Sequence, residues 1–151
     1  MIHDNPFLIT GNLATDDRGI LRFVNEFNFE NVKRFYMVEN HVVGFIRAWH
    51  AHRHEAKYVF VVEGAALVAA VRVPVDELVP SIEVADLTRY VLSAAKPSVL
   101  YIPPGFANGF KTLTADTKVM FFSTATIAES LNDDIRWPAS YLRGVWDVEE
   151  R

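Results

Sequence analysis

The sequence of 151 residues contains no cysteine. This absence excludes a disulfide framework, a zinc ribbon, a thiol nucleophile and a cysteine-ligated iron–sulfur cluster. Basic residues are not in excess either, because 15 lysines and arginines against 19 aspartates and glutamates give a formal net charge of -4. The chain therefore has no global basic field for a nucleic-acid backbone or an acidic membrane, and any anionic ligand must meet a local basic site.

Long apolar segments are also missing. No apolar stretch reaches 18 residues, and the start of the chain, MIHDNPFLITGNLATDDRG, has acidic and polar residues where a signal peptide would need a basic start and an apolar run. We expect a cytoplasmic protein with neither a membrane nor a nucleic-acid partner. Half of the residues are hydrophobic, which is enough for a substantial core. Without a linker, repeat or low-complexity tract, the sequence predicts one domain over residues 1–151.

Short β-rich segments recur along the chain, and their spacing predicts an all-β sandwich or barrel. Turn residues separate them at positions 17–19, 63–64 and 103–105. A short helix is expected at residues 125–132, with Thr124 or Thr126 as N-cap. The last 15 residues hold two tryptophans and a tyrosine and should fold back onto the barrel. The expected strands cover residues 19–24, 34–38, 42–50, 57–62, 66–73, 88–92, 98–102 and 118–123.

The most informative segment is GFIRAWHAHRHEAKYVFVVEG at residues 44–64, which contains three of the five histidines. His50, His52 and His54 alternate, so an extended chain would place them on one face of a strand. Arg47 would then point to the other face unless the strand bulges. His54 is followed by Glu55 at an expected turn and is interpreted as a solvated residue.

The same segment matches the spacing of a first cupin motif: a glycine, five residues, His-x-His, four residues, an acidic residue, six residues and a glycine. Lys57 stands where the acidic ligand belongs, and a lysine there would repel a divalent metal. In the second motif, PPGFAN, Asn108 stands where the last histidine ligand is usual. With two of four ligands missing, the sequence predicts neither a metal nor another cofactor.

This combination resembles the dTDP-4-dehydrorhamnose 3,5-epimerase family, whose members are metal-independent cupins that act on 4-keto sugar nucleotides. Four blocks carry the resemblance in matching order: DRGILRFVNEF at residues 17–27, IRAWHAH with the later Lys57, IPPGFANGF at residues 102–110, and IRWP with Trp146. HAHR is also similar to the HAHK of the sugar-nucleotide 3,4-ketoisomerases. The resemblance implies a single jelly-roll β-barrel, and a homodimer in which the N-terminal segment is shared between subunits.

The resemblance also implies roles for individual residues. His50 would be the general base that removes a proton next to the C4 ketone, and Lys57 would stabilise the enolate. Arg18, from the neighbouring subunit, and Arg47 would hold the diphosphate or the sugar, since guanidinium groups pair with phosphate. His52 is a second catalytic candidate, by similarity to the ketoisomerases. Asn108 would bind substrate as a hydrogen-bonding side chain that carries no proton.

Two departures from the family pattern leave alternatives open. The family's tyrosine acid is absent from the stretch Thr124-Ala125-Thr126-Ile127, and the aspartate that orients the histidine would belong to a C-terminal segment beyond Arg151. Four activities remain: an epimerase, a 3,4-ketoisomerase in which His50 and His52 shuttle the proton, a non-catalytic binder of a sugar nucleotide, and, least favoured, a metal-dependent cupin. Lys57 could also be a charge that protects an edge strand, and Tyr36 is interpreted as core or pocket wall.

Overall fold

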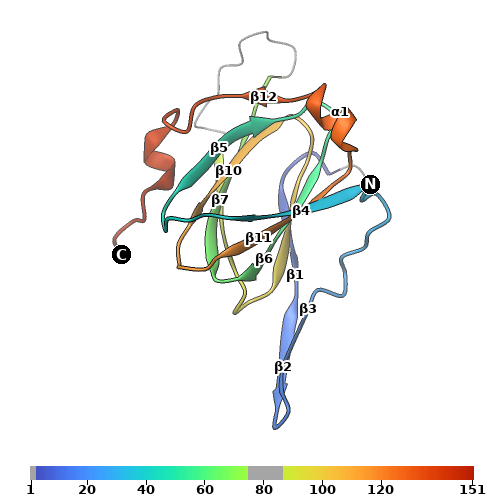
Figure 1. Ribbon diagram of the computed structural model, residues 1–151, viewed down its shortest axis with the longest axis vertical. Coiled ribbons are helices and arrows are strands. Elements are labelled where there is room, and N and C mark those ends of the chain that lie inside the picture. The colour runs from blue at the N-terminus through green and yellow to red at the C-terminus, as the bar shows by residue number, and fades with distance from the viewer. Residues whose placement is uncertain (1–2, 75–86) are drawn as a thin grey trace.

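The computed structural model describes residues 3–74 and 87–151, and strands dominate them (Figure 1). The chain order is β1 (Phe7–Thr10), β2 (Asn12–Asp16), β3 (Gly19–Phe23), β4 (Arg34–Glu39), β5 (Ile46–Ala51), β6 (Lys57–Glu63), β7 (Ala65–Arg72), β8 (Leu87–Ser93), β9 (Ser98–Ile102), β10 (Phe106–Thr112), β11 (Lys118–Ser123), α1 (Ile127–Leu131), β12 (Ile135–Arg136) and a closing 3-10 turn at Arg143–Trp146. Neither helix in the described part of the chain is long and apolar enough to cross a membrane.

Two five-stranded sheets form the barrel, with strand orders β1-β9-β6-β11-β4 and β12-β5-β10-β7-β8. Neighbouring strands in both sheets are antiparallel. This architecture confirms the predicted all-β jelly roll. β2 and β3 form a separate hairpin, which projects from the barrel at the end opposite to α1 and β12 (Figure 1).

The core between the sheets follows the period-two alternation of the strands. Val59 and Val61 of β6 point inward and are almost fully buried, together with Leu100, Phe110 and Phe121 from β9, β10 and β11. Tyr58 lies on the outer face of β6 and packs edge-on against Phe27, with ring centroids 5.2 Å apart. The continuous apolar run of β6 therefore reflects a strand covered on both faces, as the sequence predicts.

Most of the strand predictions are confirmed, and the differences have physical causes. Residues 42–45 turn instead of extending, and Gly44 at φ +82° occupies a conformation that glycine adopts without strain. β10 was not expected as a strand, because its Asn-Gly pair is a common turn signal. In the structure, Gly109 lies inside β10 because a Cβ there would come within 2.7 Å of the Arg47 carbonyl oxygen on β5. β1, β2 and β12 were also missed.

The helix and the tail agree with the sequence analysis. Thr126 is the N-cap of α1, and its hydroxyl accepts a hydrogen bond from the Glu129 backbone N–H while the Glu129 carboxylate accepts one from Thr126 N. The C-terminal segment folds back onto β5, where Trp146 packs against Trp49 with ring centroids 5.1 Å apart. Trp49 and Trp137 also exchange two backbone hydrogen bonds of 3.0 and 3.1 Å.

Removal of the Trp146 ring is expected to be costly because this side chain is 2% exposed and joins the tail to the barrel. Trp146→Ala should lower the free energy of unfolding by about 3–5 kcal/mol, as large-to-small changes in a packed core do. Val148→Ala is the matched control, since Val148 is 71% exposed, and it should stay within about 0.5 kcal/mol of the wild type. Urea titrations measure both values, and equal effects of the two substitutions would contradict the docked tail.

Candidate active site

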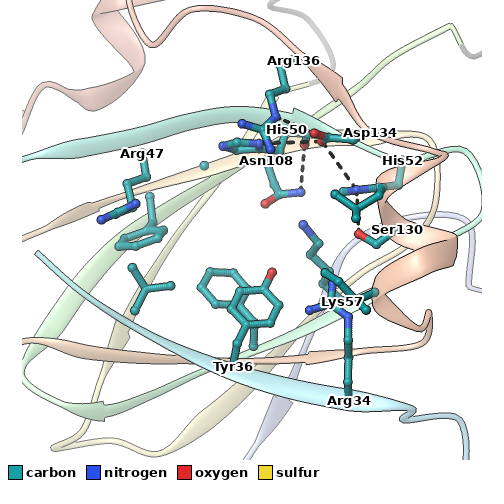
Figure 2. Close-up of a pocket in the computed structure, with 16 residues that line it drawn as sticks. Arg34, Tyr36, Arg47, His50, His52, Lys57, Asn108, Ser130, Asp134 and Arg136 are labelled. Atoms are coloured by element: carbon teal, nitrogen blue, oxygen red, sulfur yellow. Dashed lines mark hydrogen bonds and ion pairs between the residues drawn. The ribbon is translucent and has the colours of Figure 1, made fainter.

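A pocket of about 270 Å³ opens between the two sheets, at the end of the barrel that α1 and the segment around β12 cover (Figure 2). Basic, acidic and aromatic side chains meet in it. The polar side chains that line it are Arg34, Tyr36, Arg47, His50, His52, Lys57, Asn108, Ser130, Asp134 and Arg136. The structure thus brings together five of the six site residues predicted from the sequence, and Arg18 is the exception.

A bulge in β5 brings Arg47 and His50 to the same pocket. Asn108 on β10 faces His50, but Phe110, two residues later, faces Arg47, three residues before His50. The extra residue on β5 inverts the alternation, so both side chains reach the pocket. Gly109 allows this close approach of the two strands. The conflict between the positions of Arg47 and His50, which the sequence left open, is resolved in favour of a bulge.

The neighbouring carboxylates Asp133 and Asp134 have different roles: Asp133 binds the backbone, and Asp134 faces the pocket. Asp133 accepts hydrogen bonds from the backbone N–H groups of Arg53 and His54, at 2.9 and 2.8 Å, and so fixes the segment before β12 over the end of β5. Asp134 consequently faces the pocket, where its Oδ1 atom lies 4.0 Å from His50 Nδ1. Arg136 Nε donates to the other oxygen of Asp134 at 2.5 Å and holds the carboxylate in place.

The His50 side chain lines the pocket and is partly buried, with 35% of its surface exposed. It is suited to accept a proton near neutral pH. Burial lowers its pKa from 6.5, the Lys57 and Arg136 cations lower it further, and Asp134 opposes them. A lowered pKa keeps the imidazole in its neutral, basic form at pH 7.

His52 is more deeply buried than His50 and is surrounded by hydrogen-bond acceptors. Its Nε2 atom lies 3.1 Å from Glu55 Oε2, 3.4 Å from Ser130 Oγ and 3.7 Å from Asp134 Oδ1. β5 ends at Ala51, so the alternation stops before His54, which is exposed in the following turn. The expectation that all three histidines could share one strand face is therefore wrong for His54, while its interpretation as a solvated residue is confirmed.

Lys57 opens β6, which lies between β9 and β11, so it does not protect a sheet edge. The side chain is buried and lines the pocket, and its ammonium group has no hydrogen-bond or ion-pair partner among the described residues. Burial lowers the pKa of Lys57 below its ordinary value, whereas Glu55 and Asp134 partly support the cation. A desolvated cation that is not neutralised by a direct partner is available to an anionic ligand.

Tyr36 lies on β4, in the sheet opposite to the one that carries His50, and its hydroxyl points into the pocket (Figure 2). Its ring stacks on Phe121 with centroids 5.1 Å apart, and the Arg34 guanidinium lies 5.0 Å from the centre of the Tyr36 ring. Burial raises the pKa of Tyr36 to about 12, so the phenol stays protonated at neutral pH. The expected wall residue therefore also presents a hydrogen-bond donor.

Asn108 and Arg47 are held in defined orientations. Asn108 is buried, and its amide nitrogen donates to the His50 carbonyl oxygen at 3.1 Å. Its amide oxygen has no hydrogen bond from the described residues and can accept one from a ligand. Arg47 donates from Nε to Asn40 Oδ1 at 2.7 Å and lies at the end of the pocket away from His52 (Figure 2).

Arg18 does not reach this pocket within one chain. It occupies the turn of the β2–β3 hairpin, where its side chain is 86% exposed and forms an ion pair with Asp16 at 2.6 Å. The hairpin extends to the side of the barrel away from the pocket (Figure 1). A role for Arg18 in a site of this kind therefore requires a neighbouring copy of the chain.

Four polar residues that line the pocket were not singled out from the sequence: Arg34, Ser130, Asp134 and Arg136. The aspartate beside the histidine was expected beyond Arg151, but Asp134 lies next to His50 within the chain. Its only local signal in the sequence is its position two residues before the Arg136 of the IRWP block. In residues 3–74 and 87–151, no three or more histidine, aspartate or glutamate side chains are arranged to hold a metal ion.

Comparisons with known proteins agree with this picture. A family model described as dTDP-4-dehydrorhamnose 3,5-epimerase matches residues 3–151. The dTDP-4-dehydrorhamnose 3,5-epimerase of Sulfolobus tokodaii superposes with a TM-score of 0.74 at 26% identity, over 94% of this chain and 82% of that one. No curated protein sequence gives a significant match.

Two further solved structures share the fold at lower identity. An epimerase of Mycobacterium tuberculosis superposes with a TM-score of 0.74 at 19% identity, over 97% of this chain and 74% of that one. A sugar 3,4-ketoisomerase of Thermoanaerobacterium thermosaccharolyticum, in complex with TDP, gives a TM-score of 0.67 at 17% identity, over 95% and 96% of the two chains.

The buried environment of Lys57 predicts an unusual titration. Its pKa should lie below 10.5, because burial disfavours the charged ammonium, whereas the exposed Lys118, paired with Glu63, should titrate above 10.5. The chemical shifts of the lysine ¹³Cε atoms, followed by NMR between pH 7 and the alkaline limit of folding, report both values in one sample. A pKa of Lys57 above that of Lys118 would contradict the burial of the Lys57 ammonium group.

Proposed function

Because the chain belongs to the dTDP-4-dehydrorhamnose 3,5-epimerase family, we propose that it acts on a nucleotide-linked 4-keto-6-deoxy sugar by removing the proton on a carbon next to the C4 ketone. Membership makes the protein an enzyme of the sugar-nucleotide epimerase and isomerase class. The observation that carries the proposal is the convergence of a neutral imidazole, an unpaired ammonium and a phenol in one pocket. We further propose that residues 1–151 act as a single domain in the cytoplasm without metal or cofactor.

His50 is the general base of the proposed reaction. Asp134, held by Arg136, lies next to His50 Nδ1 and favours a proton on that nitrogen, so that Nε2 keeps its lone pair for the substrate. The distance of 4.0 Å between Asp134 Oδ1 and His50 Nδ1 is longer than a hydrogen bond, and such contacts commonly shorten when substrate binds. Asp134 is thus the orienting carboxylate that the family resemblance requires.

Lys57 stabilises the intermediate. When His50 accepts the proton, the C–H electron pair forms a carbon–carbon double bond and the carbonyl electrons move to the C4 oxygen. The ammonium of Lys57 donates a hydrogen bond to this oxyanion, in a partly desolvated site where such an interaction is strong. The oxyanion is also the partner that this buried cation otherwise lacks among the described residues.

Tyr36 is the candidate acid that replaces the missing family tyrosine. It approaches from β4, opposite to His50 on β5, so it can return a proton to the other face of the enolate (Figure 2). Return of the proton from that face reforms the ketone and inverts the carbon. The phenolate that forms is neutralised when His50 passes its proton back through solvent, which completes the proton balance.

Arg47 and Asn108 bind the substrate, and the diphosphate meets the guanidinium of Arg47 at the outer end of the pocket. Arg18 contributes from a second copy in a homodimer. The β2–β3 hairpin supports this assembly, because Leu13, Ile20 and Leu21 expose apolar side chains on it, and an exposed apolar arm is better accommodated at an interface between subunits than in water.

Deuterium exchange tests the reaction directly. Incubation with dTDP-, GDP-, UDP- and CDP-linked 4-keto-6-deoxy sugars in deuterated water should introduce deuterium at C3 or C5 while C4 remains the ketone, as followed by NMR. His50→Asn should reduce the rate by about 10² to 10⁴ because asparagine cannot accept the proton. Lys57→Met should also slow exchange, since it removes the cation beside the enolate. The wild-type rate should persist with a chelator.

Two control variants and the identity of the product separate the candidate activities. His54→Asn should be silent, because His54 is exposed in the turn beyond the pocket. Tyr36→Phe should retain exchange but lose inversion, since the base remains and the opposite donor is removed. A C3 ketone in the product would indicate a 3,4-ketoisomerase, and an absence of exchange with every substrate would leave a non-catalytic binder. Exchange that depends on one tightly bound metal ion per chain would contradict the proposal.

The binding roles of the arginines can be measured separately from catalysis. Arg47→Ala should weaken binding of the nucleotide sugar by about 1.5–3 kcal/mol, as loss of a charge-assisted hydrogen bond implies, and should leave the weak binding of the free sugar unchanged. Calorimetry gives both affinities. Arg18→Ala should weaken binding only if the chain is dimeric, so light scattering must accompany it. Wild-type affinity in both variants would refute the proposed position of the diphosphate.

A further inference from the structure

Glu55 is a buried carboxylate that the proposed reaction does not use. It lies between β5 and β6, and its side chain is 1% exposed, behind the wall of the pocket. A buried charge is costly unless it is paired and hydrogen-bonded. The partners of its two oxygen atoms therefore indicate what holds Glu55 at this position.

The Oε1 atom faces hydrogen-bond donors. Ser123 Oγ donates to it at 2.6 Å, and Arg34 Nη2 lies 3.5 Å away. Arg34 is itself oriented by a hydrogen bond from Nε to the Ala125 carbonyl oxygen at 3.2 Å. Ser123 and Ala125 lie at or beside the start of the segment in which the family tyrosine is absent. In this chain they instead contact Glu55 directly and, through Arg34, indirectly.

The Oε2 atom has one nitrogen as its neighbour. It lies 3.1 Å from His52 Nε2, within ion-pair distance, but it accepts no aligned hydrogen bond from the described part of the chain. A buried carboxylate oxygen without a donor is strongly unfavourable, so the proton of His52 belongs on Nε2. Asp134 Oδ1, a second carboxylate oxygen at 3.7 Å from the same nitrogen, favours the same assignment, and the Ser130 hydroxyl at 3.4 Å is compatible with it.

We propose that Glu55 is a positioning residue that holds the Nε2 proton of His52 and so fixes His52 as the Nε2–H tautomer. This inference rests on the proposed function for its effect on turnover, but not for its effect on the imidazole. An Nε2 atom committed to Glu55 cannot accept a proton from a substrate carbon. The two histidines of the HAH sequence therefore have different tasks, and His50 is left as the base.

The charged groups around His52 allow this tautomer in the neutral ring. Burial and the nearby Lys57 cation lower the pKa of His52, while Glu55, Asp134 and Asp133 oppose that shift. At neutral pH His52 is consequently an uncharged donor toward Glu55.

The ¹⁵N and ¹H shifts of the imidazole measure the tautomer without any substrate. In the wild type, His52 should show the pattern of a proton on Nε2 and a bare Nδ1. In Glu55→Gln, the amide oxygen should stay with the donors Ser123 and Arg34, which turns the amide NH₂ toward His52. A donor in that position requires a lone pair on Nε2, so the tautomer should switch to Nδ1–H. The pKa of His52 should also fall, because the substitution removes the Glu55 charge that supports the imidazolium.

Glu63→Gln is the matched control, because it removes the same charge from an exposed glutamate paired with Lys118 and should leave the His52 shifts unchanged. With a sugar nucleotide that exchanges deuterium, Glu55→Gln should reduce kcat by about 10- to 100-fold with little change in KM. An Nδ1–H tautomer in the wild type would overturn the inference even if the variant fails to fold. A tautomer switch with wild-type kcat would overturn the link to turnover, whereas absence of exchange in the wild type would refute only the proposed function.

Discussion

The hydrogen bonding of β5 on both of its sides is the constraint on which the site depends. β10 holds one edge with the bulge that turns Arg47 and His50 to the same side, and β12 holds the other edge. The pairing of β5 with β12 involves few residues, but the two backbone hydrogen bonds between Trp49 and Trp137 extend it. The ring of Trp146, packed against Trp49, reinforces it. Without the β12 contact, Asp134 and Arg136 would have no fixed position relative to the histidines.

The charge distribution of the pocket differs from that of the whole protein. The chain carries a formal charge of -4, yet four cationic side chains line the pocket, against the single carboxylate of Asp134. This imbalance is the local basic site that an anionic sugar nucleotide requires. Burial lowers the pKa of His50 most, and the Lys57 and Arg136 cations lower it further, so cations that would attract the substrate also help to keep this imidazole neutral. In the proposed reaction, electrostatics would in this way couple substrate binding to proton abstraction.

The parts of the site that could be predicted were those encoded within one segment. His50, His52 and Lys57 lie within eight residues of each other, and cupin spacing was sufficient to single them out. Asp134 could not be found in this way, because its position depends on Asp133 capping a turn about 80 residues earlier in the chain. The bulge in β5 depends on Gly109 of another strand, so the alternation of residues 46–51 alone could not determine the direction of Arg47.

The predictions of the fold succeeded and failed for the same reason: elements with a local sequence signal were found, and those that depend on distant residues were missed. Apolar alternation located most strands and the capping residues located α1, since both signals are local. β10 was missed because an Asn-Gly pair signals a turn in isolation, and only the neighbouring β5 explains a glycine inside a strand. Glu55 was passed over for a related reason: its burial results from Ser123 and Arg34, which are distant in the sequence.

The late position of Asp133 and Asp134 in the chain has a consequence for biosynthesis. Translation delivers His50 and His52 long before these two carboxylates. A truncated product that ends before residue 133 would keep β5 to β11 but would lack the carboxylate beside His50. The pocket therefore gains its carboxylate only when the segment that follows β11 has docked on β5.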